Sequence, residues 1–255
     1  MKKTVFMALA TVFATVACSD SSPTGQGGVP LQSRVLKSSG DIADSVSAFR
    51  TLIGPSNGAA PGAQPGGRRE INWDGAGANA FDNQNNFPPD FFNTTVKVGA
   101  VFTTDGTGFR NDSTSFAEID PTYAGQFSFF SPNKIFSPVG GNVLDVIFEV
   151  AGQPTPAVSS GLGIVFSDVD VAGSTTVELF AQDGTSLGIF AAPVRSDDKG
   201  LSFLGISFDQ SVIARARVTL GTGALGVGVK DITDGGTVDL VVIDNLVYGE
   251  PKQAF

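Results

Sequence analysis

The sequence predicts an all-β protein, an antiparallel β-sandwich of jelly-roll-like type with one short N-terminal helix. Apolar segments of strand length recur between Gly161 and Glu250, separated by Gly, Asp or Pro, which is typical of a sandwich rather than of βαβ units. Two of these segments flank Asp183–Gly184, a strong signal for a hairpin turn. Phe outnumbers Tyr by 21 to 2. This ratio favours a dry aromatic core over a sugar-binding platform, because platforms recruit Trp and Tyr for hydrogen bonding.

The C-terminal half carries the clearest strand patterns. Residues 214–220 alternate strictly, so the arginines fall on one face and the apolar side chains on the other. Residues 203–208 are too apolar for a half-exposed strand, and we expect them to be buried on both faces. The strands expected in this half are 176–180, 187–190, 203–208, 214–220 and 238–247, the last interrupted by Asp244–Asn245.

The front half of the β-region is less regular. Strands are expected around Trp73, at 96–103 and at 142–150. Residues 81–92 form an aromatic loop in which two consecutive prolines exclude a regular helix or strand. No regular internal repeat is present, so the sequence does not predict a solenoid or a propeller.

The chain begins with a pattern typical of export. Two lysines precede an apolar run over residues 5–14 that is too short to span a bilayer. The small residues before Cys18 resemble a bacterial lipobox, although Thr15 stands where that pattern prefers Leu. The resemblance implies cleavage directly before Cys18 and lipid on its sulfur, which would hold the protein on a membrane. The alternative is an ordinary signal peptide that is cut at a nearby site.

Cleavage at this position would leave a strongly acidic chain. Residues 1–17 contain two lysines and no acids, so the formal net charge would change from -9 to -11. Ser19 follows the cysteine, and the Asp that signals inner-membrane retention is therefore absent. We expect an outer-membrane or cell-surface location. Cys18 is the single cysteine, so no disulfide can form within one chain.

One short segment near the N-terminus has helical periodicity. Ile42, Val46, Phe49 and Ile53 lie on one face of a helix, and Gly54 followed by Pro ends it. The apolar face could dock on the sandwich, and a transient helix in a linker is the alternative. The expected units are a signal peptide (1–17), a flexible tether (18–40), a short amphipathic helix (41–54), an ordered or flexible loop (55–67) and one β-sandwich domain (68–251).

The composition excludes several kinds of chemistry. The chain has no histidine, which removes Ser-His-Asp triads, Cys-His pairs and most zinc and iron sites. No glycine-rich loop stands between a strand and a helix, so nucleotide binding has no support. The acidic charge argues against nucleic acid as a partner. We therefore expect a protein that is not an enzyme.

Carboxylates are the remaining candidates for a site. Asp168 and Asp170 flank Val169, so in a strand both would point to one face and repel each other unless water or a cation lies between them. Calcium takes about six to eight oxygen ligands and suits such groups. The alternative is that these acids are solvated and serve turns and solubility. The candidate calcium ligands are Asp168, Asp170, Asp231, Asp234 and Asp244, with Asp74 included if the first and last strands are neighbours.

A pair of carboxylates could also serve a glycoside hydrolase. None of the available glutamates lies in a recognisable catalytic motif, so this reading stays an alternative. The glutamates considered are Glu118, Glu149, Glu178 and Glu250.

Six segments spread over most of residues 66–251 carry a family resemblance: GRREINWDG, VFTTDGTGF, FSPNKIFSPVG, VFSDVDVAGSTTVELFAQDGTSLG, LSFLGISFD and VVIDNLVYGEP. Together they resemble a family of exported bacterial β-sandwich proteins of lectin-like or adhesin-like type. The resemblance implies export and a sandwich fold, and it supplies no function to transfer.

Three functions remain open at this point. The first is a lipid-anchored, extracytoplasmic, non-catalytic sandwich that binds a surface glycan or another envelope component. The second is a structural envelope protein in which calcium serves stability only. The third is a carboxylate-dependent glycoside hydrolase. The tether, the sandwich pattern and the missing catalytic residues favour the first.

Overall fold

A computed structural model describes residues 31–197 and 199–254, so the expected signal peptide and Cys18 lie outside the described residues. Within these ranges the protein is all-β, as predicted, with antiparallel strand pairing throughout its sheets. No described helix is long and apolar enough to cross a membrane. The helices are α1 (Ala43–Ile53), the 3₁₀ helix η1 (Ala76–Phe81), α2 (Phe91–Thr94) and α3 (Tyr123–Gln126).

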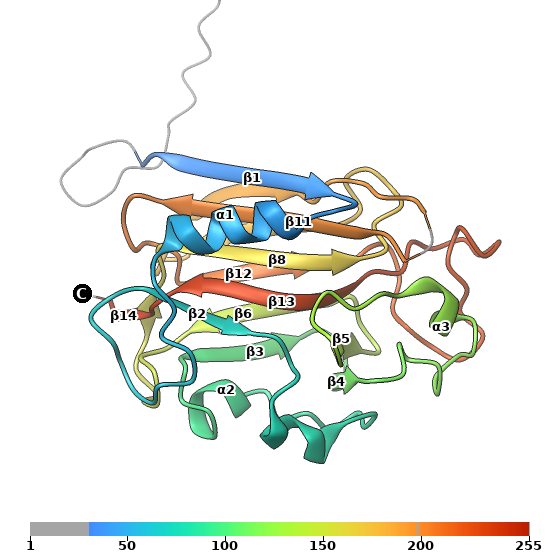
Figure 1. Cartoon of the computed structure of the whole chain (residues 1–255), viewed down its shortest axis with the longest axis horizontal. Coiled ribbons are helices and arrows are strands. Elements are labelled where there is room, and N and C mark those ends of the chain that lie inside the picture. The colour runs from blue at the N-terminus through green and yellow to red at the C-terminus, as the bar shows by residue number, and fades with distance from the viewer. Residues whose placement is uncertain (1–30, 198, 255) are drawn as a thin grey trace, which may run out of the picture.

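Two sheets form the sandwich, and Figure 1 shows the smaller one behind the larger. The strands of the larger sheet follow the order β1-β11-β8-β13-β5-β4, with β2 also paired to β13. The smaller sheet has the order β10-β9-β12-β6-β3, and β14 and β7 form a separate pair. The strands are β1 (Ser33–Ser39), β2 (Arg68–Ile71), β3 (Ala100–Thr104), β4 (Gly108–Asp112), β5 (Ile135–Val139), β6 (Val143–Phe148), β7 (Ala157–Val158), β8 (Gly161–Ser167), β9 (Thr176–Phe180), β10 (Ser186–Ala191), β11 (Leu201–Phe208), β12 (Arg215–Thr219), β13 (Val242–Gly249) and β14 (Lys252–Gln253).

The strand predictions for the C-terminal half are confirmed. Asp183–Gly184 lies in the turn between β9 and β10, which pair antiparallel as a hairpin. Strand β11 is buried along almost its whole length. Arg215 and Arg217 of β12 point away from the core and form ion pairs with Asp145. The predicted interruption at Asp244–Asn245 does not end β13, but the pairing register with β8 shifts there.

An aromatic cluster fills one part of the core, with Trp73 at its centre. The indole ring stacks on Phe136, with ring centroids 3.8 Å apart, and its N–H donates a 2.7 Å hydrogen bond to the backbone oxygen of Asp244. Trp73 does not lie in a strand, in contrast to the prediction. Strand β2 ends at Ile71, and the backbone of Trp73 has a φ of 64°, which takes the chain out of the sheet. The predicted aromatic loop 81–92 ends in the single turn of α2.

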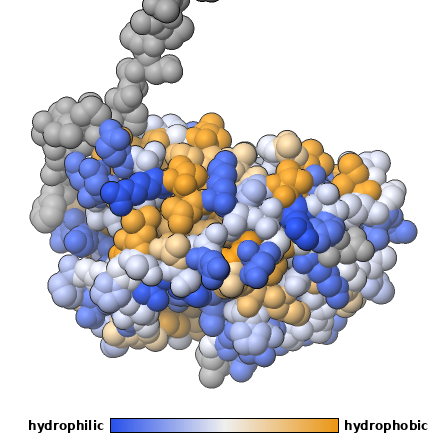
Figure 2. All heavy atoms as spheres, turned by 45° about the horizontal axis from the view of Figure 1, so that its top comes forward, coloured by the Kyte–Doolittle hydropathy of each residue, from blue (hydrophilic) through white to orange (hydrophobic). Residues whose placement is uncertain are grey.

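The prediction of a flexible tether over residues 18–40 is wrong for its last part. Strand β1 forms the edge of the larger sheet and pairs with β11 in register from Ser33 to Ser39. Backbone hydrogen bonds to β11 hold this edge strand in place, so it does not need an apolar side-chain pattern. Its polar sequence therefore gave no strand signal. Arg34 and Lys37 keep the edge charged, which discourages pairing with another chain. Figure 2 accordingly shows hydrophilic and apolar side chains interspersed on the face nearest the viewer.

The folded unit is therefore larger than the predicted domain of residues 68–251. Strand β1 and helix α1 belong to it at one end, and β14 extends it at the other.

The predicted amphipathic helix is α1, and it packs on the outer face of the larger sheet (Figure 1). Val46 and Phe49 are fully buried, and the Phe49 ring contacts that of Phe203 edge-on. Phe49 lies over two cross-strand paired glycines, Gly163 and Gly205, where an added Cβ would come within 2.6 Å of the ring. The absent side chains make room for Phe49. The helix is docked rather than transient.

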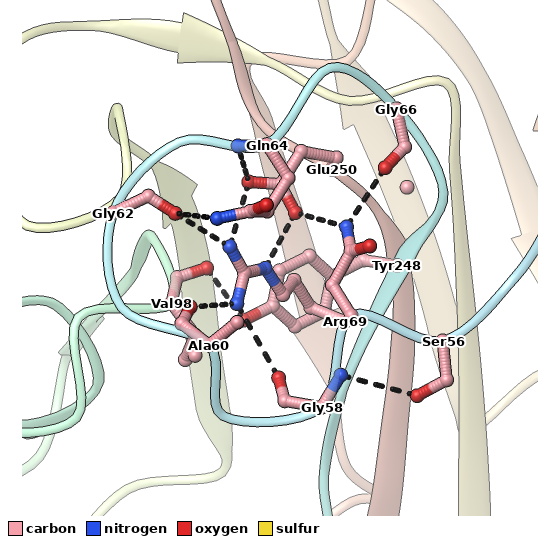
Figure 3. A network of polar contacts seen from close by, with 12 residues as sticks. Ser56, Gly58, Ala60, Gly62, Gln64, Gly66, Arg69, Val98, Tyr248 and Glu250 are labelled. Atoms are coloured by element: carbon pink, nitrogen blue, oxygen red, sulfur yellow. Dashed lines mark hydrogen bonds and ion pairs between the residues drawn. The ribbon is translucent and has the colours of Figure 1, made fainter.

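The loop between α1 and β2 is ordered around a buried ion pair (Figure 3). Arg69 and Glu250 have no accessible side-chain surface, and Arg69 Nη2 lies 2.9 Å from Glu250 Oε1. The guanidinium also donates to the backbone oxygens of Ala60 and Gly62 at 2.5 and 2.7 Å. Glu250 accepts the backbone N–H of Gln64 at 3.0 Å. The loop is thus shaped by the hydrogen bonds that the two buried charges require.

Replacing Phe49 by Ala should lower the free energy of unfolding by about 3–5 kcal/mol, because it leaves a cavity over the two glycines. Leu52→Ala on the exposed side of the same helix is the matched control and should cost well under half of that. Urea denaturation of the two variants measures the difference. Equal losses would contradict the packing of Phe49 on the two glycines as the contact that stabilises α1 on the sheet.

Candidate metal site

Three of the six predicted calcium ligands meet at one end of the sandwich. One carboxylate oxygen each from Asp168, Asp170 and Asp231 lies within 4.8 Å of the other two. Asp168 and Asp170 follow the end of β8, whereas Asp231 belongs to the connection between β12 and β13. A bridge between Asp231 and Val238 folds that connection back on itself. The fold therefore brings together acids that lie some sixty residues apart in sequence.

The first two acids do not converge in the way that the sequence suggested. Strand β8 ends at Ser167, so Asp168 and Asp170 do not share the face of a strand. Asp168 has a φ of 73°, a conformation that Asp adopts more readily than most residues. Val169 is fully buried in the core between them. A tight left-handed turn thus replaces the expected strand geometry.

Asp168 is the buried member of the cluster. It has no accessible surface, and its Oδ2 accepts a 2.6 Å hydrogen bond from Nε2 of Gln126 in α3. Asp168 Oδ1 has no hydrogen-bond partner among the described residues, and neither has Gln126 Oε1. Burial, together with smaller contributions from the charges of Asp170 and Asp231, raises the pKa of Asp168 to about 8, against the hydrogen bond from Gln126 that lowers it. At neutral pH the carboxyl group therefore holds a proton unless a cation compensates its charge.

The other side of the cluster is held in place by backbone groups. Asp231 accepts hydrogen bonds from the N–H groups of Leu240 and Thr233, both at 2.7 Å. Asp239 lies beside the cluster and accepts from the N–H of Asp170 at 3.3 Å. Burial raises the pKa of Asp239, and the charge of Asp231 adds to the effect. These hydrogen bonds hold the carboxylates of Asp231 and Asp239 in place.

Gln126 and Asp239 are missing from the predicted set. Asp239 lies inside the last predicted strand, 238–247, where a buried acid is unusual, and this position is the one signal in the sequence. Nothing in the sequence around Gln126 indicates that α3 reaches the end of β8.

The arrangement fits a hard cation. The cluster supplies carboxylate oxygens and no nitrogen or sulfur ligand, which suits Ca²⁺ or Mg²⁺ rather than zinc. Gln126 Oε1 could join the carboxylates if the amide group turned over, because hydrogen bonding decides how such an amide is oriented. A bound cation would also offset the repulsion among three carboxylates.

The three remaining predicted ligands lie outside the cluster. Asp244 is buried in β13 and accepts from the N–H groups of Phe130 and Ser131 at 2.6 and 3.0 Å and from the Ser131 hydroxyl at 2.7 Å. Burial raises its pKa to about 7, with a smaller contribution from Asp74. Strands β2 and β13 are neighbours, as the inclusion of Asp74 required. Asp234 is exposed. Asp244, through its three hydrogen bonds to Phe130 and Ser131, holds the loop that precedes β5.

Among the four glutamates considered for a hydrolase, Glu149 lines a pocket. The pocket has a volume of about 460 Å³, and Asp90 contributes a second carboxylate. Asn93 orients Glu149 by donating a 2.5 Å hydrogen bond to Oε2, and it accepts the N–H of Gly152 at 2.7 Å. The lining contains no aromatic ring. The other three glutamates bond to Arg110 (Glu118), Ser186 (Glu178) and Arg69 (Glu250).

Comparisons with known proteins show no family. No family model matches the chain, and no curated protein matches it. Among solved structures, the enzymatically active domain of tailspike protein 4 from bacteriophage CBA120 is 12% identical over 63% of this chain and 20% of that chain, with a TM-score of 0.29. A two-domain protein of unknown function from Bacteroides fragilis is 16% identical over 61% and 46% of the two chains, with a TM-score of 0.25. This chain thus spans less than half of either structure.

The stability of the protein in chelator should fall as the pH rises from about 4 toward about 8. Over this interval the folded state keeps the proton of Asp168, whereas the unfolded chain releases it near the ordinary pKa of 3.8. Asp168→Asn cannot titrate, so its stability should fall less over the same interval. Asp239 and Asp244 titrate in both proteins, and the difference therefore isolates Asp168. Urea denaturation at several pH values measures this difference, and parallel profiles would contradict the assignment.

Proposed function

We propose that this chain is an exported, non-catalytic β-sandwich that binds one Ca²⁺ through Asp168, Asp170 and Asp231. One observation carries the proposal: Asp168 is fully buried in a three-carboxylate cluster, and its Oδ1 has no hydrogen-bond partner. A buried carboxylate oxygen without a partner is costly, and a cation would remove that cost. The ordered backbone around Asp231 supports a site that is formed before the ion binds.

The ion would act as a cross-link between two loops. Asp168 and Asp170 hold the turn after β8, and Asp231 holds the long connection that leads into β13. The chain has a single cysteine, so a disulfide within the chain cannot cross-link these two loops. Calcium is favoured over magnesium because it accepts irregular oxygen geometry.

We place the protein at the outer membrane or the cell surface. The lipobox-like residues before Cys18 and the Ser that follows support a lipid anchor on an exported chain. The first described strand begins at Ser33, so a short connection would separate the lipid from the sandwich. Metabolic labelling with a fatty acid analogue, lost in Cys18→Ser, would test the anchor.

A neutral glycan of the envelope is the ligand that fits the pocket beside Glu149. Carboxylates and side-chain amides line it; both accept hydrogen bonds from hydroxyls, and the amide NH2 groups also donate to them. The orientation of Glu149 by buried Asn93 supports a binding group that is preorganised. Since the lining also holds Asp90, hydrolysis by this pair is the alternative that the same pocket allows.

Adding Ca²⁺ to chelator-treated protein should raise its melting temperature by several degrees. A site filled about 100-fold above its Kd stabilises the native state by about 2.7 kcal/mol. Asp170→Asn should abolish the rise, whereas the matched control Asp234→Asn, which changes an exposed acid of the neighbouring loop, should keep it. Differential scanning calorimetry with and without Ca²⁺ measures both. A wild-type protein that is indifferent to Ca²⁺ would refute the metal site.

Glycan binding should depend on the pocket. An array of bacterial surface polysaccharides would identify a ligand, and calorimetry would measure its affinity. Glu149→Gln should weaken binding about 10-fold or more, since a hydrogen bond to a charged group contributes about 1.5–3 kcal/mol. Glu178→Gln, on a strand outside the pocket, is the control.

The same ligand, incubated with the protein, separates binding from hydrolysis. Release of new reducing ends by the wild type and not by Glu149→Gln would replace the binding function with the hydrolase. No bound polysaccharide in the array would refute a glycan as the ligand of this pocket.

A further inference from the structure

Lys134 is the one buried lysine among the described residues. It lies directly before β5, and its Nζ donates a 2.5 Å hydrogen bond to Oδ1 of Asn79 in η1. Asp82 completes a group of three, with its Oδ2 3.9 Å from the same Nζ. A buried amine is thus held against a side-chain amide, and a carboxylate lies 3.9 Å from the amine.

The carboxylate is itself held in place and incompletely bonded. Ser113 Oγ donates a 2.8 Å hydrogen bond to Asp82 Oδ2, whereas Asp82 Oδ1 is buried and has no hydrogen-bond partner among the described residues. The backbone N–H of Asp82 bonds to the backbone oxygen of Asn79 at 3.3 Å, which keeps the two residues in one turn. Asp82 is therefore placed to exchange protons with groups at the Lys134–Asn79 contact.

We propose that Lys134 and Asn79 become joined by an intramolecular isopeptide bond, with Asp82 as the group that transfers protons. An amide is a poor electrophile, but an amine held in contact with it reacts at a high effective concentration. The carboxylate supplies the acid and base steps that the exchange needs. The bond is a modification of the folded chain and is independent of the calcium and glycan proposals.

The reaction needs no oxidant or other co-reactant. Asp82 takes one proton from the Lys134 ammonium, and the free amine adds to Cγ of Asn79, forming the new C–N bond. A second proton passes from Nζ through Asp82 to Nδ2, the Cγ–Nδ2 bond breaks, and ammonia leaves. Ammonia then takes the proton that remains on Asp82 and departs as ammonium. Asn79 is exposed, so the leaving group has a path to solvent.

The bond would fasten η1 covalently to the larger sheet, in addition to the ring contacts that Phe81 makes with Phe87 and Phe91. Helix η1 is a 3₁₀ helix between β2 and α2, and Lys134 connects it to the start of β5 in the larger sheet. A link between residues 79 and 134 closes a long loop of the chain. Such a closure restricts the unfolded state, as a disulfide would in a chain with more than one cysteine.

Intact-mass and peptide mass spectrometry of the purified full chain test the proposal. The wild type should be lighter by one ammonia than the mass calculated for its processed chain, and a tryptic digest should contain a branched peptide that joins Lys134 to Asn79. Lys134→Arg, Asn79→Ser and Asp82→Asn should each have the full mass expected for their sequence and no branched peptide. Asn86→Ser, a nearby exposed asparagine, should keep the bond.

The branched peptide decides the outcome. Loss of ammonia alone would not suffice, because Asn57–Gly58 can lose ammonia by cyclising to a succinimide. A folded wild type with full mass and separate peptides for Asn79 and Lys134 would overturn the proposal. So would a branched peptide that persists in Asn79→Ser. Circular dichroism of each variant confirms that it is folded when its mass is measured.

Discussion

The buried Arg69–Glu250 ion pair is the constraint on which the middle of the larger sheet depends. Neither side chain has accessible surface, so every donor and acceptor must be used for burial to be tolerated. The loop after α1 meets this requirement with its own carbonyl and N–H groups. The pair forms where β2 lies against β13, with Arg69 opposite Tyr248. Strand pairing, loop shape and charge burial are therefore mutually dependent.

Strand β13 links this ion pair to the acid cluster at its other end. It pairs with β8 from Tyr248 to Val242, and Val242 lies opposite Ser167. Asp168 follows Ser167, and the connection that contains Asp231 leads into Val242. The turn after β8 and this connection therefore meet at the same end of the β8–β13 pair. The register shift within β13 adjusts the pairing between the two ends. The ion pair and the acid cluster thus lie at opposite ends of one strand pair.

Sequence patterns predicted the parts of this fold that local physics decides. The β9–β10 hairpin follows from its turn residues, and the buried face of α1 follows from its periodicity. Strand β1 was missed because a polar edge strand is specified by its partner β11 rather than by its own side chains. Asp168 and Asp170 could be paired by their spacing. Asp231 stood among the predicted ligands, but the sequence could not show that it reaches these two acids whereas Asp234 and Asp244 do not, because this depends on the register of β8 against β13.

The buried acids among the described residues divide into two kinds, and the division sets Asp168 of the candidate metal site apart from the others. Asp112, Asp231 and Asp244 each accept hydrogen bonds from two or more described donors, which are mostly backbone N–H groups, and so they organise turns. Glu250 is neutralised by Arg69. Asp168 has one described donor for its two oxygens, although it is as deeply buried as the others. A turn or an ion pair explains the first kind, whereas the position of Asp168 is explained only by a proton or a cation. The two carboxylates beside it make the cation the better counterpart.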